Sequence, residues 1–135
     1  MSSLVTLAEL QALLDGVAFT SAMGMRVVSL GDAECVVRVP FRREFERPGG
    51  IVSGQVYMNA ADVAAWCAIK TRLGLDDGST TSNLETAFLA AAREEDVLCT
   101  ARVLKFGRRL VYGVAECRSE AGRLLTHHSI TYARG

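Results

Sequence analysis

The segment from Arg47 to Leu73 constrains the fold more than any other, because a glycine-rich turn leads directly into a long run of small apolar residues. Its sequence is RPGGIVSGQVYMNAADVAAWCAIKTRL, and between Val56 and Ile69 the single charged residue is Asp62. The run predicts a helix from about Gly54 to Leu73, which the glycine at position 74 ends. A helix this apolar has to be buried, so the rest of the chain must enclose it.

The remaining sequence predicts strands and one shorter helix. Leucines at helical spacing indicate a helix over residues 4–14 that ends at Gly16. Tight turns at residues 107–108 and 120–122 favour antiparallel pairing of the segments around them. The expected strands cover residues 25–30, 35–41, 80–91, 97–106, 110–118 and 124–133. We therefore expect an α+β fold with a short N-terminal helix, in which a curled antiparallel sheet of about six strands wraps around one long apolar helix.

Length and composition exclude several classes of protein. The 135 residues suit one domain that spans residues 1–135. With 15 basic and 15 acidic side chains, the net charge is zero, so neither nucleic acid nor a membrane surface is expected as the main partner. The four cysteines lack the spacing of a metal site, and neither a metal nor another cofactor is expected. The start of the chain lacks the pattern of a secretory signal, and reduced cysteines suit a cytoplasmic protein.

Asp62 and the glycine turn are the candidate site. A carboxylate within an apolar helix needs a partner or a function. Glycines at a helix start leave backbone N–H groups accessible to a ligand oxygen. Gly54 and Asp62 are eight residues apart, roughly 12 Å along a helix, so they cannot serve one site within one chain. A two-fold homodimer solves this problem, because each helix start can face the partner's acid.

Such a shared site predicts a hydrolytic reaction. Backbone N–H groups near Gly54 and Gln55 would hold a carbonyl oxygen, helped by the positive end of the helix dipole. Asp62 would then attack the carbonyl carbon or take a proton from an attacking water. The alternatives are a solvated or locally paired Asp62 and a glycine pair that forms only a turn.

Three stretches of sequence resemble the hotdog-fold thioesterases, in particular the phenylacetic-acid-degradation branch related to 4-hydroxybenzoyl-CoA thioesterases. They are RPGGIVSGQVYMNAADVA, TTSNLETAFL and ARVLKFGRRLVYGVAECRSEAGRLLTHHSITYA, and the resemblance covers roughly Phe41 to the C-terminus. It implies a hotdog fold, an acyl-CoA substrate that brings coenzyme A with it, and a homodimer or a homotetramer of two dimers.

The resemblance also implies roles for individual residues. It makes Asp62 the nucleophile or general base toward a thioester carbonyl, and it makes the amides at Gly54 and Gln55 the oxyanion contact. Thr81 falls where the family often has a hydroxyl that positions the attacking water. The basic residues of the predicted hairpin, which often meets the coenzyme A phosphates, are Lys105, Arg108 and Arg109.

Two positions depart from the family pattern. Ser53 replaces the usual histidine of the turn, and Arg47 stands where some relatives have an asparagine that helps to hold substrate or water. A guanidinium there is able to pair with a substrate carboxylate or phosphate, or with Asp62 itself. These departures leave a second hypothesis open, namely a non-catalytic protein that binds acyl-CoA or an acyl chain.

The remaining polar and aromatic residues have a structural interpretation beside a functional one. Asn59 and Trp66 lie about one helical turn on either side of Asp62, where Asn59 would bond the site or fill a dimer contact, and Trp66 would line an acyl pocket or pack in the core. His127 and His128 are neighbours in a predicted strand, so they point to opposite faces, and a structural role is the better interpretation. A hotdog-fold hydratase is disfavoured, because no histidine precedes His127.

Overall fold

The computed structural model describes residues 3–135 of the chain. The α-helices are α1 (Leu7–Gly16), α2 (Ala18–Ala22) and α3 (Gly54–Leu73), and η1 (Arg43–Phe45) is a short 3₁₀ helix. The strands are β1 (Arg26–Gly31), β2 (Glu34–Val39), β3 (Glu46–Arg47), β4 (Ile51–Val52), β5 (Thr80–Phe88), β6 (Val97–Phe106), β7 (Leu110–Arg118) and β8 (Leu124–Ala133).

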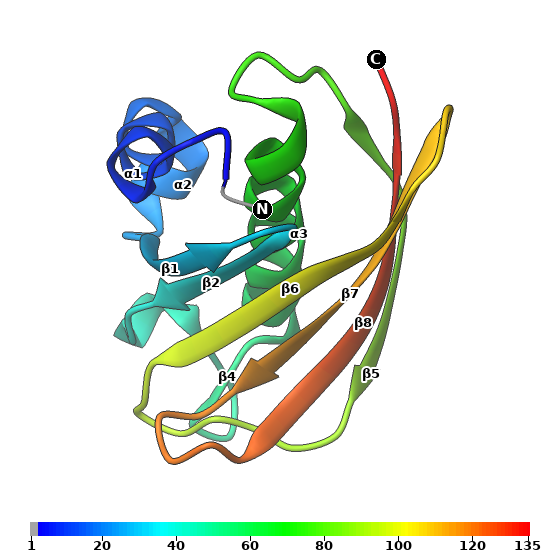
Figure 1. Cartoon of the computed structure of the whole chain (residues 1–135). Helices are drawn as coiled ribbons and strands as arrows, with labels where there is room; N and C mark the ends of the chain where they lie inside the picture. The colour runs from blue at the N-terminus through cyan, green and yellow to red at the C-terminus, as the bar shows by residue number, and fades with distance from the viewer. Residues whose placement is uncertain (1–2) are drawn as a thin grey trace.

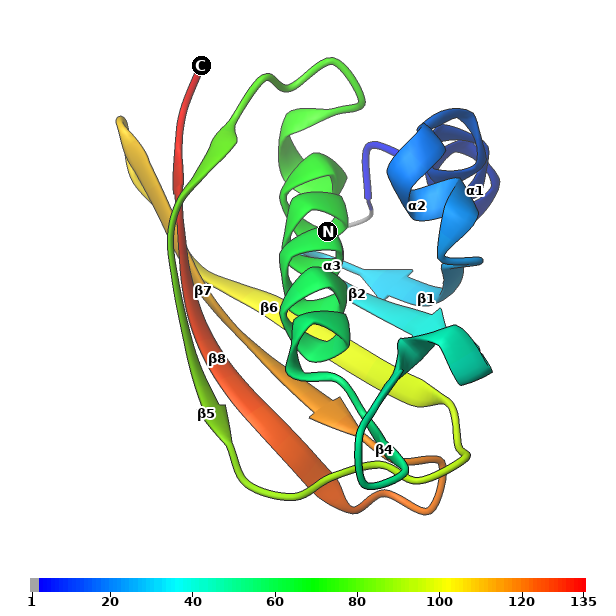
Figure 2. The same ribbon diagram turned by 180° about the vertical axis from the view of Figure 1, so that it is seen from behind.

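Six strands form one antiparallel sheet in the order β1-β2-β6-β7-β8-β5, and β3 and β4 form a separate two-stranded ribbon. The sheet curls around α3, and α1 and α2 lie beside the β1 edge (Figure 1). The view from behind shows β5 at the opposite edge of the sheet (Figure 2). The predicted α+β architecture, with a long helix against a six-stranded antiparallel sheet, is confirmed.

The core lies between α3 and the concave face of the sheet. Small side chains such as Ala60, Ala64 and Ala68 are fully buried and let β2, β6 and β7 approach the helix closely. The side of α3 that is only partly covered carries four residues spaced three or four apart, Gln55, Asn59, Asp62 and Trp66. This stripe is the face of the helix on which the candidate acid lies.

Glycines fix both ends of α3 as the sequence predicts. Gly49 and Gly50 adopt φ values of 101° and 72° in the turn that precedes the helix, a backbone region open mainly to glycine. At the other end, Gly74 is the C-terminal cap with φ 91°, and its N–H donates to the Lys70 carbonyl at 2.8 Å. Most strand bounds also match the sequence expectation closely.

Three local predictions were wrong. The first helix begins at Leu7 rather than Leu4, because Thr6 caps it. Strand β5 ends at Phe88 instead of continuing to residue 91, since the amides of Leu89 and Ala90 both donate to the Leu125 carbonyl as the chain turns. The charged stretch before α3 is not merely a loop, because it contains η1, β3 and the turn to β4.

All four cysteines are free and buried, as their apolar surroundings indicate. Within residues 3–135, none of the helices combines the length and the apolar character that crossing a bilayer requires.

Candidate active site

The start of α3 has backbone donors without partners. Ser53 is the N-cap residue, but its side chain accepts no bond from the helix and instead donates to Oε1 of Gln55. No acceptor within residues 3–135 takes the N–H of Gly54 or of Gln55. These two groups, together with the positive end of the helix dipole, are available to a ligand oxygen.

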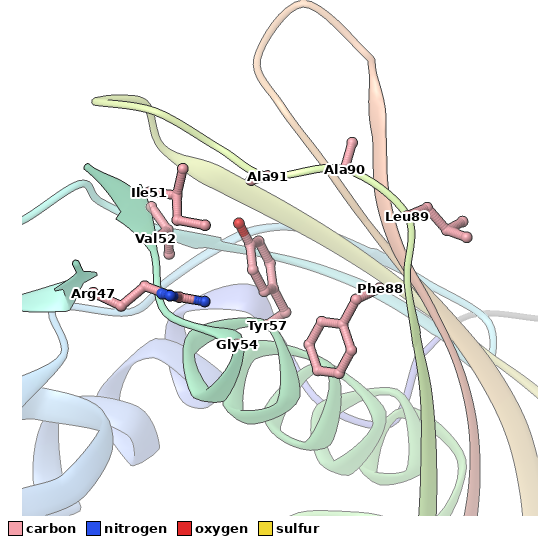
Figure 3. Close-up of a pocket in the computed structure, with 9 residues that line it drawn as sticks. All are labelled: Arg47, Ile51, Val52, Gly54, Tyr57, Phe88, Leu89, Ala90 and Ala91. Carbon is pink, nitrogen blue, oxygen red and sulfur yellow. The ribbon is translucent and has the colours of Figure 1, made fainter. Parts of the chain in front are cut away.

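The start of α3 lines a cavity of about 420 Å³, which we call the amide cavity (Figure 3). It is lined by Arg47, Ile51, Val52, Gly54, Tyr57, Phe88, Leu89, Ala90 and Ala91. The rings of Tyr57 and Phe88 meet edge to face with centroids 6.4 Å apart. A Cβ on Gly54 would stand 3.1 Å from Cε1 of Phe88, so glycine is what lets this ring lie against the helix start.

Arg47 extends its guanidinium into this space, toward the helix start and Tyr57 (Figure 3). Its Nε donates to the Pro48 carbonyl at 3.2 Å. In the described part of the chain it makes no ion pair, with Asp62 or with any other carboxylate. Arg47 therefore presents an exposed positive charge to the cavity.

Asp62 lies in a second cavity, of about 310 Å³, which we call the carboxylate cavity. It is lined by Asp62, Val63, Trp66, Ser79, Thr80, Thr81 and Tyr132. Two hydroxyls converge on one oxygen of the acid: Thr81 Oγ1 and the Tyr132 hydroxyl each lie 2.7 Å from Asp62 Oδ1. No described residue donates to Oδ2, so one carboxylate oxygen is held and the other is free.

Tyr132 is the residue of this cluster that sequence reasoning missed. Burial, reinforced by the negative charge of Asp62, raises the pKa of Tyr132 above its usual range, so its hydroxyl stays protonated and donates. It also lies 2.9 Å from the main-chain carbonyl of Asp62. In the sequence, Ile130 and Tyr132 alternate with more polar residues, which indicates that both side chains point inward from the last strand. The strand register that places Tyr132 against α3, however, depends on the whole sheet.

The other candidates on α3 lie around this cluster without bonding Asp62. Asn59 donates to Sδ of Met23 at 3.6 Å, toward α2. Trp66 lines the carboxylate cavity, and the Lys70 ammonium lies 4.8 Å from its ring centroid. Trp66 therefore lines the carboxylate cavity and also packs against the Lys70 ammonium.

The basic hairpin lies at the end of the sheet beside the C-terminus, away from the start of α3 (Figure 1). Lys105, Arg108 and Arg109 are all exposed. Ala133 pairs with Leu110 on one side and with Thr80 on the other, so the hairpin begins two strands away from the rim of the carboxylate cavity. The hairpin therefore lies at the end of the sheet that carries Thr80, opposite the start of α3 (Figure 1).

The two histidines point to opposite faces, as predicted. His128 is fully buried between the hydroxyls of Thr86 and Thr126, at 2.8 and 2.7 Å. His127 is exposed on the outer face, with Nδ1 3.0 Å from Glu116 Oε2. Neither histidine lines the amide cavity or the carboxylate cavity.

Within one chain, the candidate site residues line two separate cavities. Gly54 and Arg47 line one cavity, whereas Asp62, Thr81 and Trp66 line the other. The sequence model of the thioesterase superfamily matches residues 49–126, which is more than half of the chain and includes Gly54, Asp62 and Thr81. The chain belongs to the thioesterase superfamily. The resemblance seen in the sequence, and with it the hotdog fold, is confirmed.

Individual proteins are similar to this chain. A candidate esterase of Saccharolobus solfataricus, SSO2140, is 26% identical over 102 residues, covering 76% of this chain and 72% of its own length. The candidate thioesterase TM1040_1390 of Silicibacter sp. TM1040 is 27% identical and superposes with a TM-score of 0.89, covering 100% of this chain and 95% of the other.

A third comparison concerns the fold. The phenylacetic acid degradation protein PaaI of Thermus thermophilus, solved as a point mutant, is 24% identical with a TM-score of 0.79. The match covers 88% of this chain and 100% of PaaI. At this identity the likeness concerns the fold.

Proposed function

We propose that this protein is an acyl-CoA thioesterase whose active site is shared between two copies of the chain. Membership of the thioesterase superfamily supports a thioester hydrolase. The observation that carries the more specific proposal is the Asp62 carboxylate, held at Oδ1 by two hydroxyls and free at Oδ2.

In the proposed reaction, the thioester carbonyl oxygen accepts hydrogen bonds from the free amides at the start of α3. The dipole of this 20-residue helix adds positive potential at the same point, where negative charge develops as the carbonyl carbon is attacked. This contact comes from the backbone, so replacing the usual histidine by Ser53 does not remove it.

Asp62 acts as the general base. Its free Oδ2 takes a proton from a water molecule, whose oxygen forms the new bond to the carbonyl carbon. The carbon–sulfur bond then breaks, and the proton passes to the departing thiolate to give a carboxylic acid and a thiol. Thr81 and Tyr132 hold the carboxylate in position during these steps.

A two-fold dimer supplies the missing half of each site. Strand β5 is an edge strand that pairs with β8 alone among the described strands, so its other edge has nine residues of backbone without a partner. If two copies pair antiparallel along β5, the stripe that contains Asp62 on one α3 faces its counterpart on the other. Two equivalent sites result, and two such dimers would give a tetramer.

We infer that the basic hairpin binds the coenzyme A phosphates. Lys105, Arg108 and Arg109 are exposed, and in the described part of the chain none of their side chains makes an ion pair. Coenzyme A enters as part of the substrate, and no other cofactor is required. Reduced, buried cysteines and a coenzyme A substrate both fit a cytoplasmic location.

The proposal is tested by measuring thiol release from a panel of acyl-CoA esters. We expect the wild type to hydrolyse at least one ester and Asp62→Ala to fall to background, while Asp76→Ala, an exposed acid outside both cavities, keeps wild-type activity. Binding of the esters by calorimetry without any turnover would favour the non-catalytic alternative, and the absence of both would exclude either function.

A further inference from the structure

We propose that Arg47 selects an acyl group with a carboxylate at its far end, so that the preferred substrate is the coenzyme A monothioester of a short dicarboxylic acid. This inference rests on the thioesterase function proposed above. It concerns the acyl group, which neither the superfamily nor the catalytic acid specifies.

The charge of the amide cavity supports this assignment. Of the described residues that line the cavity, Arg47 alone is charged, and most of the others are aliphatic or aromatic. Its guanidinium is permanently positive and has five N–H donors, of which the structure uses one, on the Pro48 carbonyl. An unpaired guanidinium that faces a largely apolar cavity is a recognition element for a planar anion such as a carboxylate.

Two acids near this turn are paired with Arg43. Glu46, the residue next to Arg47, lies 3.4 Å from Arg43 Nη1, and Glu94 lies 3.0 Å from the same atom. Arg93 reaches the same turn from the other side and donates to the Gly49 carbonyl at 3.0 Å. Arg47 makes no ion pair within residues 3–135, so a ligand carboxylate would meet a guanidinium without an ionic partner.

The position of Arg47 relative to Gly54 selects the acyl end of the substrate over the coenzyme A end. Both residues line one cavity, so a thioester whose carbonyl lies at Gly54 places its nearest carbon atoms beside the guanidinium. The coenzyme A phosphates are separated from the carbonyl by the long pantetheine arm. The anion that Arg47 contacts is therefore part of the acyl group, a few bonds from the carbonyl.

The cavity shape supports a short chain. Tyr57 and Phe88 form an edge-to-face pair, and the ring of Phe88 lies against the helix start. A cavity of about 420 Å³ falls toward the lower part of the usual range for small-molecule sites. Methylene groups would contact these rings while the terminal carboxylate meets the guanidinium.

The experiment compares pairs of esters that differ only in the terminal group, namely succinyl-CoA with butyryl-CoA and glutaryl-CoA with valeryl-CoA. We expect kcat/KM of the wild type to favour the carboxylated member of at least one pair by about tenfold or more, the size of one charge-assisted hydrogen bond. Arg47→Met should lose this preference, with a much larger fall in kcat/KM for the carboxylated ester than for the neutral one, and Arg26→Met, an exposed arginine on β1, should keep it.

A different result would overturn the inference. If Arg47→Met lowered kcat equally for both members of a pair, Arg47 would act on the reacting carbonyl and would not recognise the acyl group. Equal kcat/KM for both members in the wild type would also exclude selection.

Calorimetry separates this inference from the thioesterase proposal. Asp62→Asn binds the ester without consuming it, and we expect it to bind glutaryl-CoA about tenfold more tightly than valeryl-CoA. The double variant with Arg47→Met should bind the two equally. If the wild type hydrolysed none of the esters, the catalytic proposal would fail, but this binding preference would still support selection by Arg47, and its absence would refute it.

Discussion

The two longer helices of this protein begin in opposite ways. At the start of α1, Thr6 Oγ1 accepts from the Glu9 amide at 3.1 Å, and the Glu9 carboxylate accepts from the Thr6 amide at 2.9 Å. At the start of α3, Ser53 makes no such bond, and the amides of Gly54 and Gln55 have no acceptor within residues 3–135. Side-chain and backbone groups of the chain itself therefore cap the start of α1, whereas the start of α3 is left uncapped.

The difference separates a structural helix start from a functional one. A chain that closes its helix with a capping box gains stability there. The uncapped start of α3 instead borders a cavity of about 420 Å³ beside a free guanidinium. In our account, a substrate oxygen completes this start.

The largest effect is expected from Asp62→Asn. The open helix start polarises a carbonyl but has no base of its own, so replacing Asp62 should lower kcat by about 10²- to 10⁴-fold with little change in stability. Steady-state kinetics, with Asp76→Asn as the control, measure this change. Activity within about threefold of wild type would show that the open amides work without Asp62.

The second effect isolates the amide of Gly54. Proline is well tolerated at the first position of a helix, and Ser53 already has the extended conformation, φ −64° and ψ 145°, that precedes proline. Gly54→Pro removes the N–H, whereas Gly54→Ala adds a Cβ against Phe88 but keeps the N–H. We expect kcat of the proline variant to be lower than that of the alanine variant by about 10²-fold or more. Equal kcat values would contradict an oxyanion contact at this amide.

The third effect concerns the two hydroxyls that hold the carboxylate. Thr81→Val and Tyr132→Phe each remove one bond to Asp62 Oδ1 and preserve most of the side-chain shape. We expect each variant to lose roughly tenfold in kcat, and the double variant to lose less than the product, because both bonds serve one atom. The kcat values of the wild type, the two single variants and the double variant form a double-mutant cycle. If the two losses in kcat simply multiplied in the double variant, the hydroxyls would not act on Asp62 together.

The smallest effect is expected from the N-cap residues of α1 and α3, and it is measured as a change in the free energy of unfolding. Thr6→Ala should lower the free energy of unfolding by about 1 kcal/mol without changing kcat, because it opens a capping box far from both cavities. Ser53→Ala should change it by less than about 0.5 kcal/mol, because that hydroxyl bonds only an exposed side chain. Urea unfolding measures both. A larger loss for Ser53→Ala would mean that α3 is capped in a way absent from the structure.

The helix that carries Asp62 is easier to predict from the sequence than the contacts of the Asp62 carboxylate. The bounds of α3 follow from glycines at both ends and an uninterrupted apolar run, so they depend on local signals. The contacts of Asp62 depend on register: Thr81 and Tyr132 are far apart in the sequence but pair directly across β5 and β8. Thr81 was proposed through the family resemblance, whereas nothing local marks Tyr132 as the second donor.

The amide cavity shows the same limit. Its lining residues come from β3 and β4 before α3, from α3 itself, and from the end of β5 and the segment that follows it. The sequence identified Gly54 because it matches the family motif and Arg47 because it departs from that motif. Tyr57 and Phe88, in contrast, look like ordinary core residues in the sequence. Phe88 and Leu89 are in fact 56% and 58% exposed, a feature that only the fold reveals.

The most direct test of a site shared between two chains is subunit complementation. Asp62→Asn and Gly54→Pro are expected to be inactive alone, and a mixed dimer of the two contains one site with both defects and one intact site. Refolding an equimolar mixture should make about half of the dimers mixed, so activity should recover to about a quarter of the wild-type value. If Gly54 and Asp62 act within the same chain, every site in the mixture remains defective, and no activity above that of the separate variants will appear.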